Sequence, residues 1–360
     1  MQLNRVNLSI IFLLTALLFL AACGDADNQS EGSETDSNAE AESENTEDNS
    51  SSEPLVLYAN DLTDYIADMF EEATGYEMEV VHGGGGEILS RMEAEQGNPQ
   101  WDVVWTGALS SFHGFNERDF FHEGFEPENL QYMTDEGMEH LPENNGYFPM
   151  SVHAAAVIAY NTNLMSEEEV PATWEDFLNY EGTMAMADPA VAAPAYPVVS
   201  HIFDHIGMDE SKEKFQTLFE DGRLSVFPKN GPLGQALINE EAEIAALQEH
   251  HAYDFKWDGE PVDFIWPEDG AAGSIRAVGI SKDTDNLEAA EAFVEFMLDP
   301  ETQTALAEID DRDSLFTPFA EGAVADPERE PEPYIELPDT EWASEHEAEI
   351  KEWFADQAIH

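Results

Sequence analysis

Four consecutive glycines form the sequence pattern best suited to holding a small anion. Gly83 to Gly86 follow His82 and lead through Glu87 into a helical pattern of apolar residues. Backbone N–H groups at a helix start lack intrahelical partners and lie at the positive end of the helix dipole, so they favour a phosphate or a carboxylate. The same glycines would also suit a flexible turn, and His82 would then only end the preceding strand. The predicted ligand contacts in this stretch are His82, Gly84, Gly85, Gly86 and Glu87.

A pair of histidines is the second candidate for ligand contact. His250 and His251 follow Ile244 to Leu247, a short apolar run typical of a buried strand. Neutral imidazole suits borderline metal ions, whereas protonated imidazole pairs with anions. The pair therefore contacts an anion, ligates a metal, or faces solvent on a loop. Thr106 follows another apolar run, at the expected carboxyl end of a strand, where open α/β sheets bind ligands.

The sequence lacks the motifs of the common enzyme classes. The patterns G-x-S-x-G, H-E-x-x-H and G-x-x-x-x-G-K-[ST] are absent, and the glycine run does not have the spacing of a dinucleotide-binding loop. We therefore predict that the chain is not an enzyme and has no cofactor. A secreted hydrolase is kept as an alternative.

Apolar runs and amphipathic patterns alternate along residues 55–360, as in α/β proteins. The first half of this segment predicts strands at Leu55–Tyr58, Met78–Val81 and Val103–Trp105, with a helix after each of the first two. Further strands are expected at Met184–Ala187, Leu224–Phe227, Ile244–Leu247 and Arg276–Ile280, and helices at Val198–Ile206, Ser211–Phe219, Leu233–Ile238, Leu287–Leu298, Glu301–Ile309 and Trp342–Phe354. Together with a length of 360 residues, this alternation predicts two α/β lobes with mainly parallel sheets.

The N-terminal segment has the pattern of a secretion signal that ends in a lipidated cysteine. Arg5 precedes an apolar run, Leu8 to Ala22, which is short for a membrane span, and Cys23 is the only cysteine. The residues Leu20-Ala21-Ala22-Cys23 resemble a lipobox. We predict a lipoprotein signal peptide over residues 1–22 and a lipidated Cys23 with a disordered acidic tether over 23–54; a plain secretion signal or a buried cysteine is the alternative. The mature chain would be anchored at the outer face of the cell membrane.

The charge of the chain excludes partners with a phosphate backbone. Asp and Glu number 78 against 13 Lys and Arg, which gives a formal net charge of -65. Such a surface repels nucleic acid and anionic lipid headgroups. The acids are spread along the sequence, which favours adaptation to a salty environment, where screening tolerates like charge, over a dedicated cation-binding surface.

Several short motifs, in order, resemble the extracellular solute-binding proteins of ABC importers, in the ferric-iron-type branch. They are Phe70-Glu71-Glu72-Ala73-Thr74-Gly75, Gly84-Gly85-Gly86-Glu87-Ile88-Leu89, Asn98-Pro99-Gln100, Asp102-Val103-Val104-Trp105, Trp174-Glu175-Asp176, Ala185-Met186-Ala187-Asp188-Pro189 and Pro267-Glu268-Asp269-Gly270. Each motif is weak alone, but their order and spacing over residues 55–358 are specific.

The resemblance implies two lobes of the periplasmic-binding-protein type II kind, joined by crossing hinge strands. The lobes would comprise residues 55–152 with 271–360, and residues 153–270, with the last helix docking on the surface. A monomer would close on a small molecule or ion and deliver it to ABC permease subunits. A sensory surface lipoprotein with the same fold is an alternative.

The resemblance also narrows the solute. In relatives the loop after Asp188-Pro189 often holds Ser or Thr that bond the ligand; here only backbone N–H groups and Tyr196 are candidates. Ferric-binding relatives place adjacent tyrosines where this chain has His250 and His251. We therefore expect a small anion such as a phosphate ester or phosphonate, with ferric iron as the alternative and His250 and His251 as ligands if a metal is bound.

Overall fold

The computed structural model describes residues 53–329, 333–337 and 339–357. The predicted signal peptide, Cys23 and the tether up to residue 52 lie outside the described residues. Among the helices in the described ranges, none is long and apolar enough to cross a membrane.

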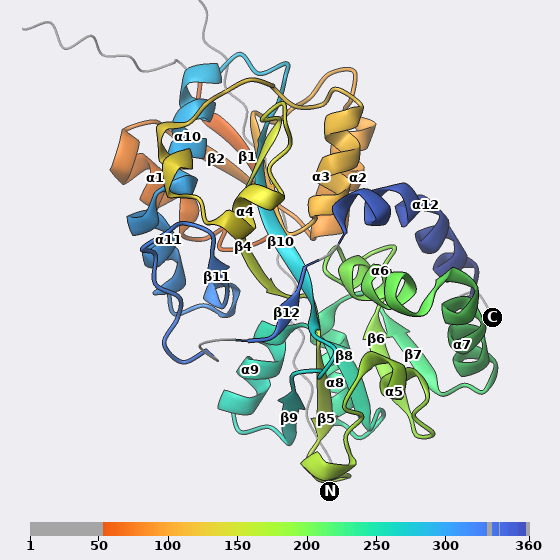
Figure 1. Ribbon diagram of the computed structural model, residues 1–360. Helices are drawn as coiled ribbons and strands as arrows, with labels where there is room; N and C mark the ends of the chain where they lie inside the picture. The colour runs from red at the N-terminus through yellow and green to blue at the C-terminus, as the bar shows by residue number, and fades with distance from the viewer. Residues whose placement is uncertain (1–52, 330–332, 338, 358–360) are drawn as a thin grey trace, which may run out of the picture. The chain divides into compact units, whose positions relative to one another are not determined.

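The first lobe is built on a seven-stranded sheet with the strand order β11-β4-β10-β3-β1-β2 and with β12 beside β10 (Figure 1). Its strands are β1 (Leu55–Ala59), β2 (Met78–His82), β3 (Val103–Thr106), β4 (Tyr147–Ala154), β10 (Ala271–Ile280), β11 (Thr317–Pro318) and β12 (Ile335–Glu336). β1 pairs in parallel with β2 and β3, whereas β10 runs antiparallel to β3 and β4.

Helices cover this sheet with apolar side chains. They are α1 (Ile66–Thr74), α2 (Gly85–Ala94), α3 (Leu109–Glu117), α4 (Asp135–Glu139), α10 (Leu287–Leu298) and α11 (Pro300–Ala307), with short 3₁₀ turns η1 (Glu128–Tyr132) and η3 (Arg312–Ser314). Phe70 of α1 meets Phe293 of α10 edge-on, with ring centroids 5.3 Å apart. α1 ends at Gly75, whose φ of 81° is the left-handed conformation that glycine adopts without strain.

The second lobe is built on a five-stranded sheet with the order β7-β6-β8-β5-β9. Its strands are β5 (Val157–Asn161), β6 (Met184–Ala187), β7 (Leu224–Phe227), β8 (Ile244–Leu247) and β9 (Val262–Ile265). Its helices are α5 (Trp174–Leu178), α6 (Ala195–Ile206), α7 (Met208–Glu220), α8 (Asn230–Ile238) and α9 (Glu249–Trp257), with the turn η2 (Glu167–Glu169).

The two-lobed α/β prediction is confirmed, and both sheets are mixed rather than mainly parallel. β6 pairs in parallel with β7 and β8, but β5 pairs antiparallel with both β8 and β9. The antiparallel strands are those next to the two chain crossings, because β4 leads directly into β5 and β9 leads into β10. A strand that enters a sheet from the other lobe need not follow the direction that a helix crossover imposes.

The last helix, α12 (Thr340–Gln357), contacts α3 of the first lobe and α6 of the second (Figure 1). Its buried residues Ala343, Ile350 and Phe354 join the core of the second lobe. Ser111 of α3 donates a hydrogen bond to Glu347 at 2.7 Å. The predicted docking helix therefore lies across both lobes.

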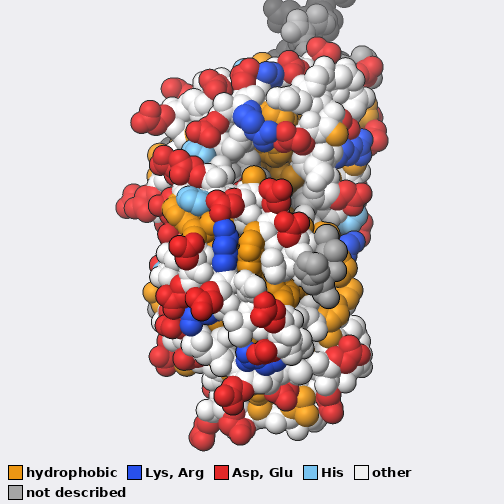
Figure 2. Space-filling model, turned by 90° about the vertical axis from the view of Figure 1, so that its right-hand side faces the viewer, with side chains coloured by type: hydrophobic (Ala, Val, Ile, Leu, Met, Phe, Trp, Pro, Cys, Tyr) orange, Lys and Arg blue, Asp and Glu red, His pale blue; other side chains and the backbone are white. Residues whose placement is uncertain are grey.

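Acidic side chains are scattered over the face of the molecule shown in Figure 2, with few lysines and arginines between them. This distribution is that of a general acidic surface rather than of one acidic block. It agrees with the spread of Asp and Glu along the sequence.

Phe354→Ala is expected to destabilise the protein by about 3 to 5 kcal/mol, because the deletion leaves a cavity among several rings. Phe354 is 2% exposed and contacts Phe203, Phe215 and Phe219. Chemical denaturation measures the change. Tyr132→Ala, at a position 39% exposed, is the aromatic control and should change stability by less than about 0.5 kcal/mol. Equal losses in the two variants would contradict the assigned role of α12.

Candidate functional site

A cavity of about 570 Å³ is lined by residues of both lobes. The first lobe supplies the segment after β1, the glycine run and the turn η3; the second supplies the loops before α6, α8 and α9. The lining residues are Asn60, Asp61, His82–Glu87, Ser90, Ala190–Pro194, Pro228–Pro232, Gln248, His250, His251, Arg312 and Asp313. This volume lies in the range typical of small-molecule sites.

A larger depression, of about 670 Å³, lies beside α5 and α7. Its basic residues are already engaged, because Lys214 bonds Asn179 and Arg223 bonds the carbonyl of Tyr180. It offers no buried polar group in need of a partner. We therefore place the candidate site in the cavity between the lobes.

Three helices begin at the wall of the cavity. The N-cap residues of α2, α8 and α9 are Gly84, Lys229 and Gln248, and all three line it. None of these caps accepts a hydrogen bond from the helix with its side chain. The uncapped N–H groups and the helix dipoles therefore give the wall a positive character that favours an anion.

Arg276 of β10 adds a buried positive charge behind this wall. Its side chain has no exposed surface, and its Nε donates to Asp61 Oδ2 at 2.7 Å. Its Nη1 and Nη2 have no hydrogen-bond partner within the described protein. A buried guanidinium with two unsatisfied nitrogens is costly unless an acceptor reaches it.

His250 and His251 are neutral at neutral pH. Burial, followed by the neighbouring His251 and His153, holds the pKa of His250 well below its ordinary value. Burial, followed by Arg312, lowers the pKa of His251 to about 4. Of the alternatives that the sequence left open, pairing of protonated imidazoles with an anion does not fit these lowered pKa values, because the two rings are removed from water beside positive groups. They can still donate an N–H.

Asp313 joins the histidines to the first lobe. Its Oδ1 lies 3.4 Å from His250 Nε2 of the second lobe. Burial, followed by the nearby Asp61 carboxylate, raises the pKa of Asp313 to about 7. The carboxyl is therefore only partly ionised near neutral pH, which limits the negative charge inside the cavity.

Most of the predicted ligand contacts line the cavity, and Thr106 does not. His82, Gly84, Gly85, Gly86, Glu87, His250 and His251 all line it. Thr106 is buried behind the wall, where its unpartnered Oγ1 would lie 3.3 Å from a Cβ placed on Gly85.

Tyr196 is not part of the cavity lining. It is 2% exposed and its hydroxyl donates to the carbonyl of Ala343 in α12. The expectation that Tyr196 contacts the ligand does not fit this geometry, because α6 turns the ring toward the docking helix.

Several residues that line or adjoin the cavity were not predicted as ligand contacts from the sequence: Asn60, Asp61, Asn230, Gln248, Arg276, Arg312 and Asp313. Asn60 and Asp61 directly follow β1, so the strand-end rule that selected Thr106 would have found them. Arg276 stands in a ten-residue strand that is buried throughout, and a charge in such an apolar run is a readable signal. Arg312 and Asp313 had no local signal.

Residues 108–343 match the family model of the bacterial extracellular solute-binding proteins. The chain belongs to this family. The two lobes, the two chain crossings and a cavity walled by both lobes agree with the match.

Curated relatives and solved structures are similar over most of the solute-binding protein. A Salmonella typhi protein named for binding 2-aminoethylphosphonate is 24% identical over 251 residues, which are 67% of this chain and 70% of the relative. A Sinorhizobium fredii protein named as an ABC transporter periplasmic-binding protein is 24% identical over 66% of each chain. The fold matches a periplasmic binding protein of Actinobacillus pleuropneumoniae with fructose 6-phosphate bound, at a TM-score of 0.75, 21% identity and coverage of 86% and 99%. It also matches the iron-bound protein HitA of Pseudomonas aeruginosa, at a TM-score of 0.72, 21% identity and coverage of 84% and 99%.

The depressed pKa of His251 predicts a pH-dependent stability for this solute-binding protein. The unfolded chain binds a proton at His251 below about pH 6.5, whereas the folded chain does so only near pH 4. Stability from this group is therefore complete above pH 6.5 and is lost as the pH falls toward 4.

His251→Gln should remove this dependence. Between pH 7 and pH 5 the unsubstituted protein is expected to lose on the order of 1 to 2 kcal/mol more than the variant. Denaturant unfolding at pH 7 and pH 5 measures the change in unfolding free energy for each of the two proteins. The contributions of all other titrating groups cancel when the two changes are compared. Parallel pH curves would show that His251 is not buried in its neutral form.

Proposed function

We propose that this solute-binding protein of an ABC importer captures a small organic phosphate or phosphonate in the cavity between its lobes. The observation that carries the proposal is the convergence of three uncapped helix starts with the unpaired nitrogens of buried Arg276. Arg312 and Lys229 add two more positive groups to the lining. A doubly charged anion in the cavity would accept hydrogen bonds from donors of the lining and would be attracted by the charge of Arg276 behind the wall.

The position of these positive groups is informative because the chain has few of them. Only 13 lysines and arginines stand against 78 acids, yet two line the cavity and a third adjoins it. A local positive field in an acidic protein concentrates an anionic solute at the cavity and disfavours it elsewhere on the surface.

Ferric iron fits the cavity less well. Fe³⁺ prefers hard oxygen ligands, and the described lining includes no tyrosine. Of its carboxylates, Asp61 already accepts from Arg276 at 2.7 Å, and Asp313 is only partly ionised. The nearby guanidinium groups would also repel a cation. The iron-bound relative shares the fold, and its identity of 21% carries no ligand set to this chain.

The names of two relatives support an organic anion. One is named for 2-aminoethylphosphonate, and another was solved with fructose 6-phosphate. Glu87 and Asp313 in the same lining would accept hydrogen bonds from the ammonium or hydroxyl groups of such a solute. The phosphoryl end would face the helix starts, and the polar tail would face these carboxyls.

The two lobes meet over the cavity through backbone contact. A Cβ on Gly86 would lie 2.4 Å from the carbonyl oxygen of Val191, and one on Gly85 would lie 2.5 Å from the Ala193 Cβ. Because these two residues have no Cβ, the start of α2 approaches the loop before α6 more closely than it could with side chains at these positions. We propose that this contact forms on closure and that the solute favours closure by binding the closed state more tightly.

The remaining parts of the proposal concern delivery. The lobes comprise residues 55–152 with 271–360 and residues 153–270, and they move about the crossings between β4 and β5 and between β9 and β10. The closed form engages permease subunits and leaves the solute chemically unchanged, so the protein is not an enzyme. A lipid on Cys23, after removal of residues 1–22, holds the monomer at the outer face of the membrane through the acidic tether.

Lys229→Gln combined with Arg312→Gln tests the anion site. The pair should weaken binding of 2-aminoethylphosphonate or fructose 6-phosphate at least tenfold, about 1.4 kcal/mol, and reduce the ligand-induced rise in Tm. Calorimetric titration measures the affinity. Arg118→Gln combined with Lys282→Gln removes the same charge from exposed sites and should leave it unchanged. No Tm shift with any phosphate ester or phosphonate, together with a shift for ferric citrate, would favour iron.

Gly86→Ala tests the closure contact. The added methyl group would overlap the backbone of Val191, so the closed state should be disfavoured and solute affinity should fall at least tenfold, about 1.4 kcal/mol. Gly84→Ala is the matched control, because a Cβ there meets nothing within 4 Å and its φ of −63° suits alanine. Similar affinities in the two variants would show that the glycine contact is not needed for binding.

A further inference from the structure

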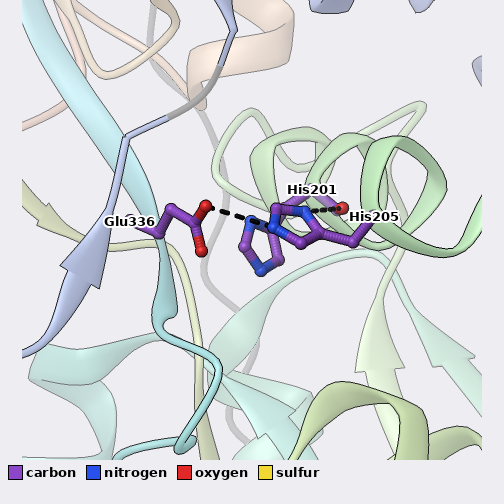
Figure 3. A group of neighbouring side chains, drawn as sticks. All are labelled: His201, His205 and Glu336. Atoms are coloured by element: carbon purple, nitrogen blue, oxygen red, sulfur yellow. Dashed lines mark hydrogen bonds and ion pairs between the residues drawn. The ribbon is translucent and has the colours of Figure 1, made fainter.

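Three side chains outside the cavity converge where α6 meets β12. His201 and His205 stand four residues apart on α6, and Glu336 belongs to β12 (Figure 3). One candidate donor atom from each lies within 4.8 Å of the other two. Both rings point from the helix toward the carboxylate, and their centroids are 4.2 Å apart.

The hydrogen bonds of His205 determine which nitrogen carries its proton. Its Nδ1 lies 3.0 Å from the carbonyl oxygen of His201, and a carbonyl can only accept. Nδ1 therefore bears the hydrogen, and Nε2 of the neutral ring presents a lone pair. That lone pair lies 3.1 Å from Glu336 Oε1, which is also an acceptor. A cation is needed between them, and it is either a proton or a metal ion.

The surroundings favour a metal ion. An imidazole that ligates a metal commonly donates its other N–H to a backbone carbonyl, which is the arrangement of His205. His201 is 5% exposed, and its ring lies beside that of His205, with one candidate donor atom within reach of both other ligands. Asp269 lies close enough to sense the charges of both His205 and Glu336, and it adds negative potential.

We propose that His201, His205 and Glu336 form a site for a zinc-class divalent cation, separate from the solute cavity. Two imidazole nitrogens and one carboxylate oxygen are a ligand set that zinc accepts, with a fourth position open to water. Histidines four residues apart on one helix present their rings on the same face, as such a site requires. The acidic surface raises the local concentration of divalent cations.

The bound ion would join two parts of the chain that are distant in sequence. β12 is only two residues long and pairs with β10 through Ile335 and Glu336. α6 belongs to the second lobe. A metal ion shared by Glu336 and the two histidines would hold β12 against α6 and would stabilise the folded chain by mass action.

Zinc titration of the untagged full chain tests the site. After treatment with a chelator and dialysis, calorimetric titration with ZnCl₂ should show one site that disappears in Glu336→Gln and weakens on the order of 100-fold in His205→Gln. Both substituted residues are partly exposed, so the variants should fold; their circular dichroism and solute affinity should match those of the unsubstituted protein. Co²⁺ in place of Zn²⁺ should give the visible absorption of a tetrahedral ion.

Two control variants separate this site from other histidines. His113→Gln removes a His–Glu pair on α3 whose members are 3.9 Å apart and four residues apart, with His113 partly exposed, and it should leave zinc affinity unchanged. His250→Gln removes a histidine of the solute cavity and should also leave it unchanged. The proposal is overturned if zinc does not bind, or if His250→Gln abolishes binding while His205→Gln and Glu336→Gln do not. Retained binding in both of the latter variants would likewise overturn it, and the pair would then be a protonated imidazole bound to a carboxylate.

Discussion

A guanidinium group with no exposed surface must be satisfied by negative or accepting partners, and among the described residues Arg276 has only one such partner. Asp61 binds its Nε, and the two remaining nitrogens are unpaired. Arg276 stands in β10, which follows the second crossing between the lobes, and Asp61 follows β1 at the edge of the cavity. The Arg276–Asp61 ion pair therefore connects the strand that follows the second crossing with the edge of the cavity, and it puts a positive charge behind the cavity wall.

The acidity of the protein makes this arrangement selective. A net charge of -65 repels anions over most of the surface, so the proposed anionic solute would bind only where helix starts and basic side chains outweigh the acids. Two of the three acids in the described lining carry less free negative charge, because Asp61 is paired with Arg276 and the raised pKa of Asp313 leaves it partly protonated near neutral pH. His250 and His251, which burial holds neutral, contribute donors without charge.

A second buried ion pair connects the segment before β12 with the start of α9. Arg329, in the segment before β12, binds Glu249 at the start of α9, and Glu249 also accepts from the backbone N–H of Ala154 at the first crossing. A buried pair of this kind costs much desolvation, but breaking it would leave an uncompensated charge. It therefore fixes how the second lobe meets the crossing strands. α12, which contacts helices of both lobes, and β12, which carries Glu336 of the proposed metal site, both belong to the C-terminal part of the chain, after Arg329.

The local sequence pattern alone predicted several strands and part of the candidate site. The strands at Met184–Ala187, Leu224–Phe227 and Ile244–Leu247 were predicted with the bounds that the structure has. The first and the last are continuous apolar runs, as short buried strands are. The glycine run and the histidine pair could be chosen as site residues because glycine at a helix start and adjacent imidazoles are locally recognisable.

Tertiary structure decided the orientation, the remaining members and the charge of the site residues. Tyr196 turns away from the cavity because α12, distant in sequence, docks on α6 and binds its hydroxyl. Arg312 and Asp313 reach the cavity only because η3 contacts α9 of the other lobe. Whether His250 carries a charge depends on burial by segments that no local pattern specifies. Sequence patterns report which residues can form an element or bind a ligand, whereas proximity between distant segments, and the electrostatics that proximity creates, exist only in the folded chain.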